Sequence, residues 1–196
     1  MAHTATAPGK MKSKSASSAH KTARKSARKS TSHDAIVMLR DDHQKVLAMF
    51  RAYNRGKDKL TPAHKQKIAE KICDELKVYT RLEEELFYPA VGEGVPGCED
   101  LLAEARVEHT SLKRLIADIA ENTPGSEEYD ADVKVLGEYV RHHVEEEHED
   151  LFPKVRKSGM DLKALGQAMT TRKKHLQGQV ETESEADALF GGAFAG

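Results

Sequence analysis

The apolar residues of this 196-residue chain recur at intervals of three and four in four successive stretches, and this periodicity constrains the fold more than any other feature. Such spacing places the apolar side chains along one face of a helix. The stretches begin near residue 34, after Thr61, after a loop at 89–97 and after a second loop at 122–126. None of them has a strand pattern. Because short loops join the helices, we predict an all-α fold, an antiparallel up-down four-helix bundle.

Capping residues predict where the first two helices begin. In "TSHD" (31–34), we expect Thr31 or Ser32 to cap the first helix and Asp34 to lie in its first turn. Thr61 is expected to cap the second helix, with Pro62 at the first helical position, where proline is well tolerated.

Two prolines and a Gly/Pro-rich segment predict the helix ends. We expect the second helix to end before Pro89, with a loop over 89–97, and the fourth to end before Pro153. A shorter amphipathic segment follows, with apolar residues at Leu162, Leu165 and Met169. The predicted organisation is a disordered basic N-terminal tail at 1–33, a four-helix bundle at 34–156, a short peripheral helix at 157–180 and a flexible C-terminus at 181–196.

The charge of the chain is divided between two regions. Residues 1–33 carry eight Lys or Arg and no acid, whereas residues 34–196 carry 23 basic and 32 acidic residues. The tail has almost no large apolar side chain, so we expect it to be disordered. Its cations, at residues 10–29, would contact nucleic acid without sequence preference. A tail that only keeps the protein soluble, or that folds back onto the acidic bundle, would have the same composition.

Several classes of protein are excluded by what the sequence does not contain. The longest apolar run, "AIVML" (35–39), is far too short to span a bilayer, so we expect no membrane partner. Cys73 and Cys98 form neither a disulfide framework nor a metal-finger pattern, which favours the cytoplasm. No hydrolase motif is present, and "GEGVPG" (92–97) lacks the spacing and preceding strand of a phosphate-binding loop.

Six polar residues interrupt the apolar stripes at positions that should face the core. A buried carboxylate costs several kcal/mol unless it is paired or binds a metal. Inward-facing carboxylates and imidazoles from all four helices predict a metal site, and nitrogen and oxygen donors without thiolates suit non-haem iron. The candidate metal ligands are His43, Tyr79, Glu83, His109, His143 and Glu147.

An internal repeat relates these residues in pairs. His43 and His109 are 66 residues apart, and three further pairs are each 64 apart: Tyr79 and His143, Glu83 and Glu147, Pro89 and Pro153. Ordinary buried polar residues would not have matched offsets. We therefore predict that two helical hairpins each supply half of one pseudo-symmetric site, with Glu83 and Glu147 able to bridge two ions.

The stretches "RLEEELFYPA" and "RHHVEEEHEDLFPKV" resemble the hemerythrin-like HHE cation-binding domain, and the resemblance covers about residues 34–156. It implies two iron ions with an oxo or hydroxo bridge, and a centre that meets peroxide, dioxygen or nitric oxide. By resemblance, the iron ligands would be His43, Glu83, His109, His143 and Glu147. Six other histidines fall outside the matched positions and are expected to be exposed at the surface: His20, His33, His64, His142, His148 and His175.

Tyr79 departs from the family pattern, which has histidine at this position. Three interpretations are open. Tyr79 could bind iron as a phenolate, which would favour Fe(III) at rest and chemistry on peroxide, as in the tyrosine-ligated haem of catalase. It could instead form only a hydrogen bond beside the site, leaving one iron with an open position. Or one metal position could be lost.

These observations give three functional hypotheses. The first is a di-iron protein that removes peroxide in a catalase-like reaction or otherwise reacts with dioxygen, with no catalytic residue assigned beyond the metal centre. The second is a protein that binds or senses iron, dioxygen or nitric oxide without turnover. In the third, the basic tail brings a peroxide-removing bundle to DNA.

Overall fold

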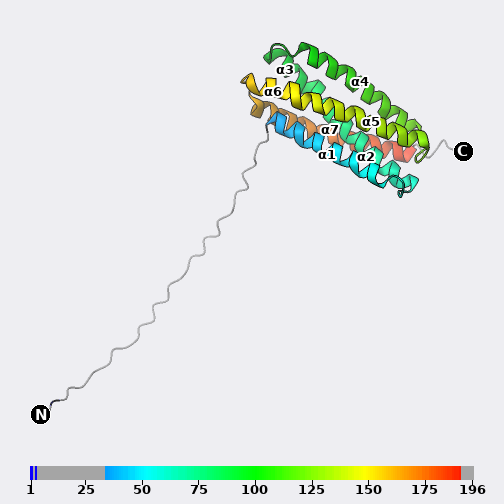
Figure 1. The fold of residues 1–196 in the computed structure, drawn as a ribbon, viewed down its shortest axis with the longest axis horizontal. Coiled ribbons are helices and arrows are strands. Elements are labelled where there is room, and N and C mark those ends of the chain that lie inside the picture. The colour runs from blue at the N-terminus through cyan, green and yellow to red at the C-terminus, as the bar shows by residue number, and fades with distance from the viewer. Residues whose placement is uncertain (2, 4–33, 191–196) are drawn as a thin grey trace. The chain divides into compact units, whose positions relative to one another are not determined.

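The computed structural model describes residues 1, 3 and 34–190, and these residues contain helices but no strand. The predicted disordered tail at 1–33 lies, apart from residues 1 and 3, outside the described residues. Within these residues, seven α-helices and two π-helical turns, η1 and η2, follow one another, and Figure 1 shows how the α-helices are arranged. They are α1 (Ala35–Gly56), α2 (Pro62–Leu82), η1 (Glu83–Phe87), α3 (Tyr88–Gly94), α4 (Glu99–Glu121), α5 (Glu127–Glu146), η2 (Glu147–Leu151), α6 (Phe152–Lys157) and α7 (Leu162–Phe190).

Four long rods form the bundle, because η1 joins α2 to α3 without a break and η2 joins α5 to α6. Around the bundle, α1 packs against α2, α2 against α4, α4 against α5, and α5 against α1. Short loops connect successive rods, which therefore run antiparallel. The predicted four-helix bundle is confirmed.

The second helix begins as predicted, but the first differs by its cap. Thr61 caps α2, its side chain accepting from the His64 N–H, and Pro62 is the first helical residue. Asp34, expected in the first turn of α1, is itself the cap and accepts from the Val37 N–H at 2.9 Å. Its carboxylate also pairs with Arg156, which ties the start of α1 to the end of α6.

Neither Pro89 nor Pro153 ends its helix, so the predicted helix ends are wrong. The π-turns explain why: the Tyr88 N–H bonds to the Glu83 carbonyl, five residues back, and the Phe152 N–H bonds to the Glu147 carbonyl. Proline has no N–H to donate, and the wider turn before it accommodates the lost bond. The first of these helices continues to Gly94 and the second to Lys157. The loop predicted at 89–97 is therefore shorter and lies at 95–98.

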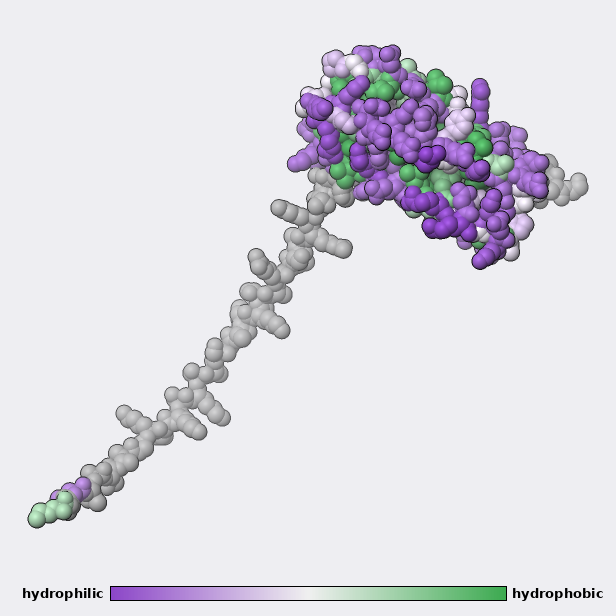
Figure 2. All heavy atoms as spheres, viewed as in Figure 1, coloured by the Kyte–Doolittle hydropathy of each residue, from purple (hydrophilic) through white to green (hydrophobic). Residues whose placement is uncertain are grey.

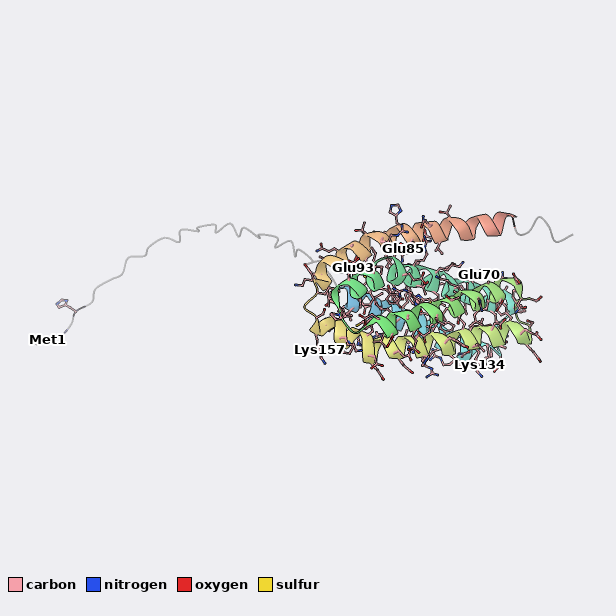
Figure 3. All side chains as sticks on the ribbon, turned by 90° about the horizontal axis from the view of Figure 1, so that it is seen from above. Met1, Glu70, Glu85, Glu93, Lys134 and Lys157 are labelled. Carbon is pink, nitrogen blue, oxygen red and sulfur yellow. The ribbon has the colours of Figure 1, made fainter. Side chains whose placement is uncertain are left out.

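The C-terminal helix is longer than predicted. α7 begins at Leu162 and continues beyond residue 180, the predicted end of the peripheral helix, to Phe190. No proline or glycine interrupts residues 181–190, and their Glu and Ala are good helix formers. α7 packs along α1 and α2 (Figure 3). Residues 191–196 lie outside the described residues.

The core consists of two apolar clusters with polar residues between them. The first includes Leu39, Leu82, Phe87, Leu102 and Leu151. The second includes Val46, Phe50, Leu76, Leu112 and Leu136. Hydrophilic side chains cover most of the face seen in Figure 2.

Close packing in the second cluster depends on one glycine. A Cβ at Gly137 of α5 would lie 2.9 Å from the Phe50 ring of α1, so a larger residue would push these helices apart. The cluster also contains Cys73, one of two free, buried cysteines. Within 34–190, no helix has the length and apolar character to cross a membrane.

Candidate metal centre

The structure brings all six candidate residues into the middle of the bundle, between the two apolar clusters. Each is almost fully buried, with at most 3% of its surface exposed. They come from every rod: His43 from α1, Tyr79 from α2, Glu83 from η1, His109 from α4, His143 from α5 and Glu147 from η2. The two glutamates are the first residues of the two π-turns, so the irregular turns lie at the site itself.

Five of the six form two overlapping groups that could each hold a metal ion. One group is His43, Glu83 and Glu147, and the other is Glu83, His109 and His143. In each group the donor atoms lie within 4.8 Å of one another. Glu83 belongs to both groups, so its two carboxylate oxygens could bind two neighbouring ions.

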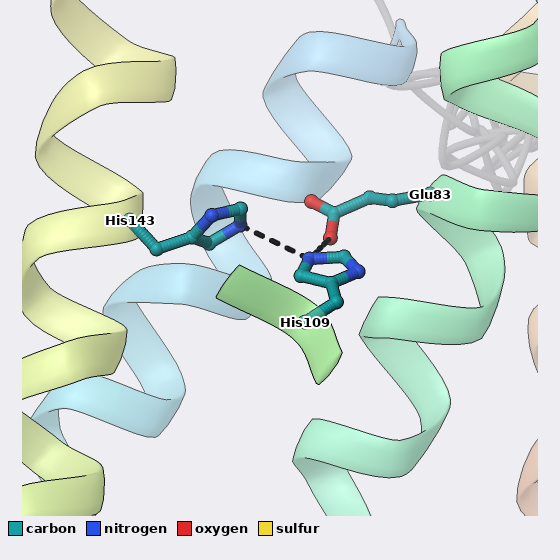
Figure 4. A group of neighbouring side chains, drawn as sticks. All are labelled: Glu83, His109 and His143. Atoms are coloured by element: carbon teal, nitrogen blue, oxygen red, sulfur yellow. Dashed lines mark hydrogen bonds and ion pairs between the residues drawn. The ribbon is translucent and has the colours of Figure 1, made fainter. Parts of the chain in front are cut away.

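Short distances connect the donors within each group. His43 Nε2 lies 3.2 Å from Glu83 Oε1 and 3.5 Å from Glu147 Oε2. In the second group, His109 Nε2 lies 3.4 Å from Glu83 Oε2 and 3.2 Å from His143 Nε2. Figure 4 shows Glu83 and His143 converging on the His109 ring from two sides.

Buried oxygens without hydrogen-bond partners indicate that the residues suit metal ions. Among the described residues, Glu83 Oε2, Glu147 Oε2 and the Tyr79 hydroxyl are buried and accept or donate no hydrogen bond. An unsatisfied buried polar group costs about 1–3 kcal/mol, and more if it is charged. Two cations among these oxygens and the imidazole Nε2 atoms would satisfy the site, and nitrogen with carboxylate oxygen is a donor set suited to iron.

Each of the three imidazoles has a polar neighbour at its Nδ1, on the side away from the site. Nδ1 of His109 lies 3.0 Å from Glu84 Oε1, and Nδ1 of His143 lies 2.7 Å from Glu108 Oε2. A carboxylate at this position fixes the ring so that Nε2 points into the site and strengthens it as a donor. Neither glutamate was predicted from the sequence, although Glu84 is adjacent to Glu83 and Glu108 to His109.

His148 supports the third imidazole, which corrects the prediction that it is simply exposed. It is half-buried, and its Nε2 lies 3.1 Å from His43 Nδ1. His148 and Glu84 are 64 residues apart, the offset of the internal repeat, so the repeat itself contained the signal. By contrast, the prediction for His142 is confirmed, since 62% of its side chain is exposed.

Tyr88 is a further site residue that the sequence did not reveal. Its buried hydroxyl donates to Glu147 Oε1 at 3.0 Å and lies 3.3 Å from His109 Nε2. Because Pro89 was expected to end the helix, Tyr88 was assigned to a helix end. The π-turn carries the helix on, and this places the Tyr88 side chain in the site.

Tyr79 lies beside the first group. Its ring centroid is 5.3 Å from that of His43 and 6.4 Å from that of His109. The hydroxyl has no hydrogen-bond partner among the described residues. All three interpretations of Tyr79 are compatible with this geometry.

The pKa shifts in the site arise because Glu83 and Glu147 are buried close to each other. Burial raises the pKa of Glu83, but the imidazoles of His109 and His43 beside its carboxylate outweigh burial and hold the pKa well below its usual range. Burial and the nearby Glu83 carboxylate raise the pKa of Glu147. Burial, then Glu83 and Glu147, also raise the pKa of Tyr79. Ionised Glu147 and a Tyr79 phenolate would therefore each require a cation beside them.

A bundle whose core holds two overlapping His/Glu groups defines a helical cation-binding protein. The family model "Hemerythrin HHE cation binding domain" matches residues 34–155, and the chain belongs to this family. A hemerythrin HHE cation binding domain-containing protein from Mycobacterium kansasii has the same fold, with a TM-score of 0.62, 20% identity, and coverage of 75% of this chain and 89% of that one.

One curated relative has a name that points to nucleic acid. A protein from Nostoc named "DNA nickase" is 30% identical over 123 residues, which are 61% of this chain and 32% of the relative. The chain therefore spans about a third of that protein, most of which has no counterpart in the match.

Proposed function

We propose that the protein binds two iron ions in this centre and reacts with peroxide or dioxygen, and that its principal activity is a catalase-like removal of hydrogen peroxide. His43, Glu83 and Glu147 would hold one ion, and Glu83, His109 and His143 the other. The observation that carries the proposal is the position of Glu83, shared by two donor groups among buried carboxylate oxygens that lack hydrogen-bond partners.

Tyr79 distinguishes this chain from the family pattern and directs the choice of reaction. We assign its hydroxyl as a phenolate ligand of the ion at His43, its nearest candidate neighbour by ring distance. An anionic oxygen donor favours Fe(III), and the proposal includes a ferric resting state with the oxo or hydroxo bridge that the family resemblance implies. Bound iron would supply the reversible change of oxidation state that dismutation of peroxide requires.

The other residues of the site would orient the imidazoles, donate a proton to a small oxygen species and shield the site from water. Tyr88 holds a proton on its hydroxyl, between Glu147 Oε1 and His109 Nε2, where it can donate to a small oxygen species that enters the site. Glu84, Glu108 and His148 keep the imidazoles oriented. Leu39, Leu76, Leu112 and Leu136, all fully buried, limit the entry of water.

Evolution of oxygen tests the activity directly. Hydrogen peroxide is added to iron-loaded protein, and we expect oxygen release that is lost with the iron in Glu83→Gln. A fully occupied site without turnover would contradict the enzyme hypothesis and would favour binding or sensing of dioxygen or nitric oxide.

A second candidate function, association with DNA, is favoured by a separate observation. Residues 1–33 carry eight cations and no acid, and the relative from Nostoc is named for an action on DNA. If residues 10–29 contact phosphates, full-length protein should be retained on DNA at low salt and released steeply as salt rises, with a log–log slope of up to about −7 if all eight cations take part. Equal retention of a variant lacking residues 1–33 would contradict this function.

A further inference from the structure

A second group of metal-binding side chains lies at the surface, beside the buried centre. Glu108 of α4 and His142 and Glu146 of α5 place their donor atoms within 4.8 Å of one another. His142 Nε2 lies 3.3 Å from Glu146 Oε1 and 3.7 Å from Glu108 Oε1. His142 is 62% exposed and Glu146 30% exposed, so solvent reaches this group directly.

A small pocket is lined by residues of both the surface group and the buried centre. Its volume is about 10 Å³, and it is partly open to solvent. Glu108 and Glu146 line it together with the buried residues His143 and Glu147. Only 3% of the surface of Glu147 is exposed, and its Oε2 has no hydrogen-bond partner. A residue of the buried centre with an unsatisfied carboxylate oxygen therefore contributes to the same pocket as the surface group.

The electrostatics of the pocket favour a cation. Within the described part of the chain, neither Glu108 nor Glu146 forms an ion pair with lysine or arginine. The carboxylates of Glu108 and Glu104 lie close enough to act on Glu146, so several negative charges gather at this opening. Acidic clefts concentrate cations from solution and speed their association.

The corresponding positions in the other half of the bundle carry different side chains. By the repeat offsets, Val78, Leu82 and Asp42 correspond to His142, Glu146 and Glu108. Val78 and Leu82 are buried and apolar, and Asp42 is paired with Lys173 of α7. Of the two faces related by the repeat, one is therefore closed by apolar side chains and α7, and the other carries metal-binding side chains.

We propose that Glu108, His142 and Glu146 form an entry site for divalent metal ions. These residues would capture an ion at the surface and pass it through the pocket to His143 and Glu147. Glu108 connects the two sites, because Oε1 faces His142 and Oε2 faces Nδ1 of His143. The proposal rests on the buried centre's being a metal site, as proposed above, and it adds the route by which that site is filled.

The rate of metal uptake tests the route independently of activity. Metal-free protein is mixed without oxygen with excess Co²⁺, and visible absorption of the bound ion is followed in wild type and in the double variant His142→Ala/Glu146→Gln. We expect uptake about tenfold slower in the double variant, with the same final number of ions per chain, because charge focusing in clefts contributes 10-fold or more to association. Glu145→Gln is the matched control: it removes one adjacent exposed charge, which pairs with Arg141 outside the group, and should leave the rate within about twofold.

Two results would overturn the entry site while leaving the buried centre in place. One is equal uptake rates in wild type and double variant. The other is a lower final number of ions in the double variant, which would make the surface residues part of the permanent site. Failure of wild-type protein to bind Co²⁺ at all would instead overturn the buried metal centre, and the entry site with it. Circular dichroism of each variant checks the fold.

Discussion

The two helical hairpins of the bundle supply the same kinds of residue but use them differently. In the second hairpin, Glu108 precedes a site histidine and supports another, holding Nδ1 of His143 at 2.7 Å. In the first, Asp42 occupies the equivalent position before His43, but position 79 is a tyrosine, which has no Nδ1 to hold. Asp42 pairs instead with Lys173 of α7, and its Oδ2 has no hydrogen-bond partner.

The two hairpins therefore differ both in the site and in its surroundings. In the second hairpin, Glu108 orients a histidine of the site. In the first, the equivalent acid, Asp42, pairs with α7, which packs along α1 and α2. The internal repeat is thus matched at His43 and His109 and at Glu83 and Glu147, but it differs at Tyr79 and His143 and in what surrounds the site.

The largest expected effect is the loss of both metal positions when the shared residue is changed. Glu83→Gln removes the carboxylate common to the two donor groups, so iron per chain should fall from two to less than one, measured by elemental analysis. Glu93→Gln, an exposed neighbour on the same rod, is the control and should retain two. Loss of only one iron would mean that Glu83 is not shared.

The comparison between hairpins is tested most sharply by changing the two equivalent acids. Glu108→Gln should weaken equilibrium metal affinity about 10- to 100-fold, because it removes the acid that orients His143. Asp42→Asn should change affinity by no more than about twofold, and should instead destabilise the protein by about 1 kcal/mol through loss of the Lys173 pair. Affinity measured at equilibrium does not depend on the route of entry.

An equal loss of affinity in Glu108→Gln and Asp42→Asn would contradict this assignment, since it would mean that both acids support metal ligands. Thermal denaturation of the metal-free proteins separates the two effects, because only Asp42→Asn should lower the stability through α7.

Tyr79→His makes the hairpins alike and should alter redox behaviour more than occupancy. Iron should remain at two per chain, while the reduction potential rises, because a neutral imidazole stabilises Fe(III) less than a phenolate does. Potentiometric titration of wild type and variant measures the shift. An unchanged potential with unchanged iron would show that Tyr79 does not touch the metal.

The smallest predicted effect lies away from the site, in a charged cluster that links α1, α2 and α5. Asp130 accepts from Tyr53 at 2.7 Å and pairs with Lys65. Burial raises the pKa of Asp130, but the bonds from Lys65 and Tyr53 outweigh it and hold the pKa below its usual value. A depressed pKa stabilises the fold above the unfolded value of about 3.9, and this contribution disappears as pH falls through the folded pKa.

In metal-free protein, Asp130→Asn should therefore lower the free energy of unfolding by about 1 kcal/mol at pH 6, and by less at pH 3. Urea denaturation at the two pH values measures the difference, and iron binding by the variant should be normal. A gap of the same size at both pH values would exclude this electrostatic origin.

Much of the fold could be predicted from the sequence because each helix carries a regular apolar stripe. The buried site could be predicted because polar residues such as His43 and Glu83 interrupt those stripes at repeated offsets. The role of Tyr88 could not be predicted, because its position in the site depends on a π-turn. In the sequence, the proline that follows Tyr88 suggests a helix end instead. The extent of α7 could not either, since its outer turns depend on helix propensity and leave little apolar pattern.

The most direct test of the metal centre is to count iron and record the visible spectrum of wild type beside Tyr79→Phe. The account predicts two irons per chain in the wild type and a broad visible phenolate-to-iron absorption that Tyr79→Phe abolishes. One iron or none in the wild type, or a band that persists in Tyr79→Phe, would contradict it.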